Sequence, residues 1–314
     1  MPQPVVIDSD PGIDDSLALL LALASPELDV RGISVSYGNT VVENAMRNAV
    51  EIIRRAGRRL PLAVGARRPL KRALAVALET HGASGVGDAP VPPAGVVFDF
   101  MKPLERLLAD QPEPVTLVTL GPVTSLASAL KRAPDVVREK VSRHIAMIGN
   151  LEARGNTTPY SEFNAWCDPE ALSQVVAAEL PTDLVTLDVT REVVLSGAEV
   201  GALAQVKDAK AAWLSGALSF YHRFHQQYEG LDGCVLNDVL VIASLIDPSV
   251  LVFQPSRLTV SLDDGDERGR TVVDPEGWRV RVATTVRAEA VRRMLFERVL
   301  PWLSEPALAG AKRT

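Results

Sequence analysis

The sequence predicts an α/β fold: an open, mostly parallel sheet flanked by helices, with a helical and small antiparallel elaboration in the C-terminal third. Two observations predict it. Short apolar runs alternate with segments whose apolar residues recur at helical spacing, which is the pattern of strands joined by covering helices. The strand candidates are continuous apolar runs that do not alternate with polar residues, as a sheet covered on both faces requires.

The expected elements follow one another along the chain. A strand over residues 5–7 leads into a helix over 13–24, and further pairs follow. Strands are expected at 30–36, 60–64, 115–120, 145–148 and 184–189, and helices at 41–55, 126–131 and 169–178. The last third is different, with helices expected at 209–227, 239–246 and 288–300 and a small antiparallel patch at 258–262, 271–273 and 280–283.

The bulk composition limits the classes of protein. With 314 residues, 47% of them apolar, and no linker, repeat or low-complexity segment, one domain over residues 1–314 is expected. A net charge of −6 argues against a nucleic-acid partner, because binding a phosphate backbone needs clustered Lys and Arg. No apolar run approaches the ~20 residues that span a membrane. The two cysteines form no disulfide framework, so a cytoplasmic location is expected.

Four carboxylates gather directly after the first strand. Asp8, Asp10, Asp14 and Asp15 fall within eight residues, at the carboxyl end of a strand, where ligands bind in such sheets. Acidic residues also favour helix N-termini, which accounts for one or two of them. Four so close together repel one another, and a hard cation such as calcium relieves the repulsion. A metal site is therefore the favoured interpretation, although Asp-x-Asp after a first strand also occurs in phosphate-transfer enzymes.

Other polar residues allow both a structural and a functional interpretation. Asn39 and Asn156 are each typical of turns. Glu162 and Asn164 stand in an otherwise apolar stretch, where an unpaired carboxylate is costly to bury, which favours a binding site. His81 beside a glycine fits an ordinary loop equally well. An aromatic helical face such as the one around His222 and His225 is more often core than a binding site.

Seven segments, in order, resemble the inosine–uridine-preferring nucleoside hydrolase family. The first, DSDPGIDD, departs from the family's pattern only at Ser9. The others are SYGN at 36–39, HGASG at 81–85, LGPVT at 120–124, Gly155-Asn156 with EFN at 162–164 and DPEA at 168–171, LDVT at 187–190, and Gly233-Cys234 with Asn237-Asp238. The resemblance implies calcium-dependent hydrolysis of the N-glycosidic bond of ribonucleosides, in nucleoside catabolism and salvage, by a homodimer or homotetramer.

The resemblance also implies roles for individual residues. Calcium would be bound by Asp10, Asp15, Asp238 and the backbone carbonyl of Leu120, with Asp10 also the base that activates water. The ribose hydroxyls would be held by Asp14, Asn39, Asn156, Glu162 and Asn164. Asp8 would orient its neighbours, and His81 belongs to a loop that the family places at the substrate.

Asn237 is where the chain departs from the family, whose members often have a histidine there as the acid that protonates the leaving base. An asparagine amide can bind the base but has no titrating proton to transfer. His225, on the aromatic helix just before it, is the first candidate for that role.

Two alternatives remain open at this level. A metal-dependent phosphatase with an Asp-x-Asp motif would need cations near the strand ends, where Arg154 is the only one evident among the polar loops. A nucleoside- or ribose-binding protein with weak or no turnover would keep the polar residues and lack the acid, as Asn237 suggests.

Overall fold

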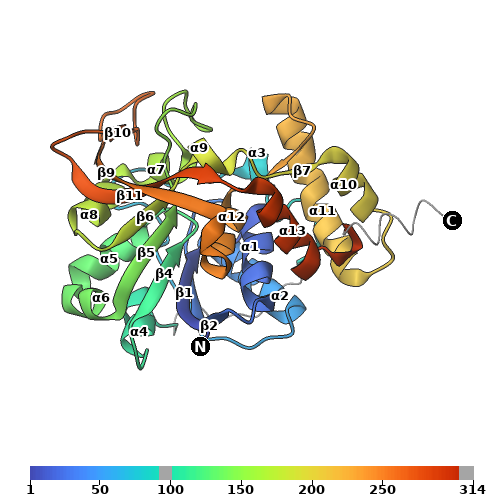
Figure 1. Ribbon diagram of the computed structural model, residues 1–314, viewed down its shortest axis with the longest axis horizontal. Coiled ribbons are helices and arrows are strands. Elements are labelled where there is room, and N and C mark those ends of the chain that lie inside the picture. Colours follow the sequence, from blue (N-terminus) through green and yellow to red (C-terminus); the bar gives the residue numbers. More distant parts are fainter. Residues whose placement is uncertain (92–100, 304–314) are drawn as a thin grey trace.

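The computed structural model describes residues 1–91 and 101–303. Within these residues nine strands form one sheet in the order β10-β9-β11-β6-β5-β4-β1-β2-β3 (Figure 1). The strands from β11 to β3 are parallel to one another. Their bounds are β1 Gln3–Ser9, β2 Leu28–Val35, β3 Leu62–Val64, β4 Val115–Thr119, β5 Val141–Met147, β6 Thr182–Val185, β9 Leu251–Val260, β10 Thr271–Val273 and β11 Trp278–Val286.

Helices cover both faces of this sheet, as the continuous apolar strands predict. Val5 and Ile7 of β1 belong to one hydrophobic core and Val6 between them to the other, because successive side chains of a strand point to opposite faces. The first core is closed by α1 Ile13–Ala24, α2 Val42–Arg55, α11 Ala209–Phe224, α12 Asn237–Ile246 and α13 Ala288–Arg298, and the second by α4 Leu104–Ala109, α5 Thr124–Arg132, α6 Pro134–Lys140 and α8 Pro169–Ala177.

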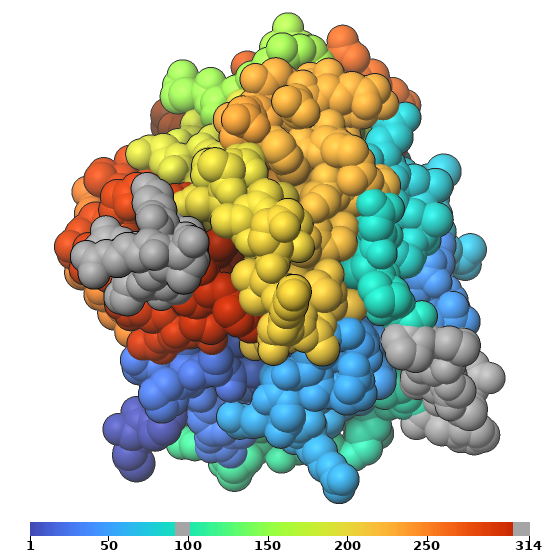
Figure 2. All heavy atoms as spheres, turned by 90° about the vertical axis from the view of Figure 1, so that its right-hand side faces the viewer, coloured from blue at the N-terminus to red at the C-terminus, as the bar shows by residue number. Residues whose placement is uncertain are grey.

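The predicted antiparallel patch exists, and it continues the main sheet. β9 pairs antiparallel with both β10 and β11, and β11 then pairs parallel with β6. A separate two-stranded sheet forms from β7 Val194–Ser196 and β8 Gly233–Val235. Beside it lies α10 Gly197–Leu203; α10 and α11 cover the side of the molecule seen in Figure 2, between α13 (red) and α2 (blue).

One predicted element is wrong in part of its length and another, although helical throughout, changes its type of helix near its end; both differences affect the site. The run 184–189 was expected to be one strand, but β6 ends at Val185 and Leu187–Thr190 forms the short helix α9. The backbone N–H groups of Leu151, Glu152 and Ala153 all donate to the Asp188 carboxylate, which fixes this turn by long-range contacts. The helix expected over 209–227 is α-helical only to Phe224 and continues as a π-helix over His225–Glu229.

None of the helices in the described parts of the chain is long and apolar enough to cross a membrane. The single-domain assignment over residues 1–314 stays a prediction.

Candidate active site

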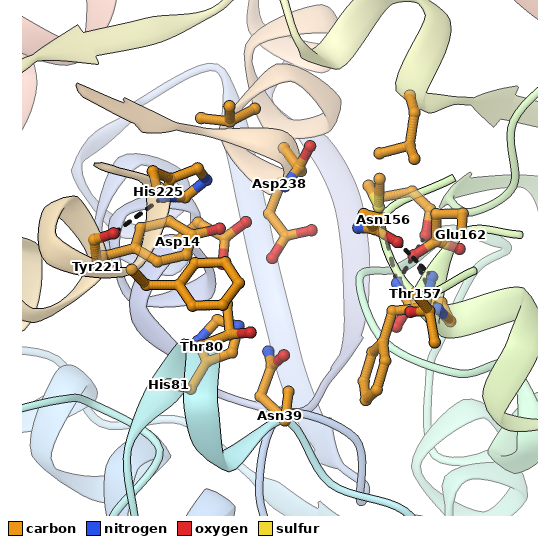
Figure 3. A pocket seen from close by; sticks show the side chains of 18 of the residues that line it. Asp14, Asn39, Thr80, His81, Asn156, Thr157, Glu162, Tyr221, His225 and Asp238 are labelled. Carbon is orange, nitrogen blue, oxygen red and sulfur yellow. Dashed lines mark hydrogen bonds between the residues drawn. The ribbon is translucent and has the colours of Figure 1, made fainter. Parts of the chain in front are cut away.

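One pocket collects the polar residues that follow the parallel strands. It opens at their carboxyl ends, between the loops after β1, β2, β4 and β5 and the helices α9, α11 and α12. Two further short helices contribute, α3 Leu78–His81 and α7 Phe163–Cys167. Its lining includes ten residues that the sequence singled out: Asp14, Asn39, His81, Leu120, Asn156, Glu162, Asn164, His225, Asn237 and Asp238. Figure 3 shows Asp14 and Asp238 between His225, Tyr221 and His81 on one side and Asn156 and Glu162 on the other.

A buried acidic cluster lies where the N-termini of α1 and α12 meet. Carboxylate oxygens of Asp14, Asp15 and Asp238 lie within 4.8 Å of one another, and all three side chains are buried. Burial, with repulsion from neighbouring carboxylates, raises the pKa of Asp14 to about 7 and that of Asp238 well above its usual value. Such a cluster is stable as carboxylates only beside a positive charge, so it fits a cation with oxygen ligands.

Asp10 adds a fourth carboxylate beside this cluster. Its Oδ2 accepts a hydrogen bond of 2.7 Å from the backbone N–H of Asn39, whereas its buried Oδ1 has no partner among the residues described. Gly38 and Gly121 enclose the carboxylate, and a Cβ at either position would clash with it. This backbone cradle fixes Asp10 and leaves one oxygen without a hydrogen bond, as a ligand or base requires. Asp10 and Asp15 are not part of the pocket lining itself.

Asp15 and Asn39 hold each other in place. The Asn39 amide donates to Asp15 Oδ2 at 2.7 Å and to the Asp10 carbonyl, while Ser9 donates to Asp15 Oδ1 at 2.6 Å. The Gly12 N–H also donates to Asp15, so the carboxylate is oriented before any ligand binds. Asp8, expected to orient the cluster, instead faces Ser34 and Ser125, and burial raises its pKa to about 7.

Gly121→Ala is expected to reduce activity at least about 10²-fold with little loss of secondary structure, because the new Cβ displaces the Asp10 carboxylate from its cradle. The measurement is the catalytic rate of the purified variant, beside its circular dichroism spectrum. Gly201→Ala, where a Cβ meets nothing within 4 Å, is the matched control. Wild-type kcat in Gly121→Ala would show that the position of Asp10 is not critical.

The opposite wall is organised by Glu162 and Asn164. Glu162 caps α7 and accepts backbone N–H bonds from Gly149, Asn164 and Ala165, and burial raises its pKa to about 7. The Asn164 amide donates to the carbonyls of Leu120 at 2.8 Å and Met147 at 3.0 Å. Its Oδ1 is therefore left for the pocket. Asn156 is more exposed, and its Oδ1 accepts from the Phe163 N–H.

The two histidines of the pocket are held in different tautomers. His81 Nδ1 accepts the Ile13 N–H at 3.1 Å, so its proton is on Nε2. His225 Nδ1 lies 2.9 Å from the Tyr221 carbonyl and must donate to it, so Nε2 is the atom left for a substrate. Burial lowers the pKa of His81 to about 3 and lowers that of His225 as well. Both imidazoles are thus held in the neutral form near pH 7.

Asn237 is oriented by Thr190, the last residue of the LDVT segment. The Thr190 hydroxyl donates to Asn237 Oδ1 at 2.8 Å. The Asn237 side chain interacts with Asp14, which offsets part of the rise that burial causes in the pKa of Asp14. The next residue, Arg191, lines the same pocket. Arg154, the cation noted in the sequence, lines the adjoining groove instead. Arg191 directly follows the LDVT segment and was not predicted as a site residue, and Tyr221 and Phe224, also in the lining, lie on the aromatic helical face that was expected to be core.

Comparisons with known proteins agree with this site. Residues 5–293 match the family model described as inosine-uridine preferring nucleoside hydrolase. A pyrimidine-specific ribonucleoside hydrolase RihA from Photobacterium profundum is 34% identical over 280 residues, 87% of this chain and 89% of that protein. A plant nucleoside hydrolase structure, PpNRh1, superposes with a TM-score of 0.87 at 30% identity and covers 98% of this chain and 100% of its own.

A further solved structure, a purine-preferring ribonucleoside hydrolase from Gardnerella vaginalis, has a TM-score of 0.87 at 26% identity, over 96% of this chain and 99% of its own. These matches run through the whole α/β fold and all of the strand ends that line the pocket. They favour the hydrolase over the phosphatase and the binding protein. The chain belongs to the inosine-uridine preferring nucleoside hydrolase family, and it is an enzyme, a nucleoside hydrolase.

Proposed function

We propose that this enzyme hydrolyses the N-glycosidic bond of ribonucleosides with the help of a calcium ion, giving ribose and the free base. The observation that carries the proposal is the buried carboxylate cluster beneath a pocket lined by amide and carboxylate groups. Asp10, Asp15, Asp238 and the Leu120 carbonyl would hold the ion. This all-oxygen ligand set, without His or Cys, suits a hard cation such as calcium better than zinc.

When bound, the ion would lower the pKa of a coordinated water and compensate the carboxylate charges. The Oδ1 of Asp10, which has no hydrogen-bond partner among the residues described, would take the proton of the attacking water. Asp14, Asn39, Asn156, Glu162 and Asn164 would bind the ribose hydroxyls. Their hydrogen bonds would stabilise the flattened, positively charged ribosyl ring of the transition state more than the ground state.

For the leaving base we propose His225 as the proton donor, with His81 and Asn237 as hydrogen-bonding groups. His225 lies in the pocket, in a π-helical turn, and its Nδ1 bond to the Tyr221 carbonyl directs Nε2 away from its own helix. Burial lowers the pKa of His225, so the protonated form is a minority at neutral pH and a stronger acid.

Release of ribose from uridine and inosine, measured as reducing sugar with and without calcium, tests the function. Calcium-dependent release of more than one equivalent of ribose per enzyme molecule supports the proposed function. Tight nucleoside binding without ribose release would establish the binding protein instead. Phosphate release from a phosphomonoester, with no ribose from nucleosides, would establish the phosphatase.

His225→Ala is expected to lower kcat on nucleosides about 10²–10⁴-fold, the usual contribution of a general acid, and to remove one limb of the pH–rate profile. Because the pKa of His225 is lowered, that limb should fall as pH rises from a point below the usual histidine range. His222→Ala is the matched control, since His222 pairs with Asp232 and is not in the pocket lining. Wild-type rates in His225→Ala would exclude it as the acid.

Asn237→His restores the residue that relatives often carry. We expect it to raise kcat on inosine if proton transfer limits the rate, because a titrating group then faces the base. No gain, in a variant that still binds calcium, would show that the missing histidine is not limiting. The homodimer or homotetramer, the role in nucleoside salvage and the cytoplasmic location that the sequence predicts remain predictions.

A further inference from the structure

The pocket offers many hydrogen-bonding groups to the ribose but few proton donors to the leaving base. Asn237 has no titrating proton; its Oδ1 accepts from Thr190 and its side chain also interacts with Asp14. His81 is a neutral Nε2–H donor that burial keeps from becoming a cation. His225 is neutral for most of the time near pH 7. Yet a base that departs with the electron pair of the bond carries negative charge that something must stabilise.

Arg191 is the one Lys or Arg that lines this pocket within the described residues. It directly follows Thr190, so the same short helix that orients Asn237 also brings a guanidinium to the pocket. Its hydrogen bond to the Gly155 carbonyl is a long one, 3.5 Å. No carboxylate pairs with it within residues 1–91 and 101–303, in contrast to Arg72, Arg132 and Arg292 elsewhere on the chain.

A guanidinium without a carboxylate partner is unfavourable in a partly buried position unless a bound ligand interacts with it. It presents five N–H donors and a permanent charge, and the Gly155 carbonyl occupies only part of this capacity. Because Arg191 is partly buried, its charge acts on bound ligands more strongly than it would in water. The nucleosides of the proposed reaction are neutral when they bind, so the negative charge that Arg191 would meet is the one that develops on the departing base.

We propose that Arg191 is a catalytic residue that binds the departing base and stabilises its negative charge as the C1′–N bond breaks. The electron pair of that bond goes to the base nitrogen, the water oxygen forms the new bond to C1′, and the water proton goes to Asp10. The base, whose developing negative charge Arg191 stabilises, takes its proton from His225, the donor proposed above. The inference rests on the proposed hydrolysis and adds a permanently charged residue to its mechanism.

The test compares two leaving groups in the presence of calcium. Uridine and inosine release bases that are unstable as anions, whereas 4-nitrophenyl β-D-ribofuranoside releases a phenolate that is stable without help. Arg191→Gln is expected to lose about 10²–10³-fold in kcat on the nucleosides, the loss typical of one donor to a developing charge, and far less on the aryl riboside. Arg191→Lys should recover part of the nucleoside rate because it restores the charge without the planar fork.

Arg154→Gln, in the adjoining groove, is the matched control and should keep wild-type rates on all substrates. Equal losses on nucleosides and aryl riboside in Arg191→Gln would mean that Arg191 has a structural role, and no loss on nucleosides would mean that it has none in the reaction; either result overturns the inference. Failure of the proposed function looks different, since wild-type enzyme would then release no ribose from either kind of substrate.

Discussion

Exhaustive chelation is expected to lower kcat on nucleosides by at least about 10²–10³-fold, and added calcium is expected to restore it. The reason is the buried group of Asp14, Asp15 and Asp238, with Asp10 beside it, whose carboxylates repel one another unless a cation lies among them. The measurement is ribose release at a series of free calcium concentrations, with metal content determined on the same samples. Full activity in metal-free protein would refute the proposed calcium site.

Single substitutions locate the ion. Asp238→Asn should weaken calcium binding and activity together, because it removes one charge from the buried group. Asp247→Asn is the matched control: it changes the carboxylate at the other end of the same helix, which accepts the Ser249 N–H at 2.9 Å. If both substitutions weakened calcium binding equally, the ion would not lie at the N-terminus of α12.

The same carboxylates are expected to make the metal-free protein less stable as the pH rises. The pKa values of Asp14 and Glu162 are raised to about 7, so the folded protein keeps protons that the unfolded chain loses near pH 4. Between about pH 4 and 7 the folded state then binds more protons, and stability falls as pH rises. We expect the Tm of chelated protein to fall from pH 5 to 8, and calcium to reduce that slope. Equal slopes with and without calcium would contradict it. Asp8, whose pKa is also about 7, lies apart and should leave part of the slope in place.

Local patterns account for most of the fold and for half of the site. Apolar runs predict the strands, and the polar residues directly after β1, β2, β4 and β5 meet in one pocket because parallel strands end at one edge. Asp10, Asp15 and Asp238 were expected as metal ligands from a resemblance; that Asp15 and Asp238 lie close together, where the start of α12 meets the start of α1, required the fold.

The other half depends on contacts that the sequence does not display. The run 184–189 is mostly apolar, as a strand would be, whereas the contacts that hold the short helix Leu187–Thr190 in place, three N–H bonds to Asp188, come from residues 151–153, far away in the sequence. A single π-helical turn such as His225–Glu229 is too short to produce a periodic pattern that would predict it from the sequence. Arg191 and His225 both adjoin these two irregular segments, which is why their part of the pocket was hard to predict in detail.

The ribose 2′-hydroxyl is expected to be required for catalysis, with kcat/KM for 2′-deoxyuridine about 10⁴-fold below that for uridine. Several buried groups of the pocket are proposed to bind the sugar, among them the Asp14 carboxylate and the Asn164 Oδ1. The amide hydrogens of Asn164 already donate to Leu120 and Met147. A substrate that lacks the hydroxyl leaves such groups buried without a hydrogen-bond partner. The free-energy cost of an unpaired buried group exceeds the net stabilisation that one hydrogen bond gives.

The loss should fall mainly on kcat, because hydrogen bonds to the ribose are proposed to strengthen as the ring flattens toward the transition state. Asp14→Ala provides the matched comparison. It removes one of the carboxylates that the missing hydroxyl would leave unpaired, so uridine should lose much more rate than 2′-deoxyuridine, and the two substrates should converge. Comparable kcat/KM for the two nucleosides in the wild-type enzyme would show that these residues do not bind the 2′-hydroxyl. Unchanged discrimination in Asp14→Ala would exclude Asp14 alone and shift the contact to the Glu162 and Asn164 wall of the pocket.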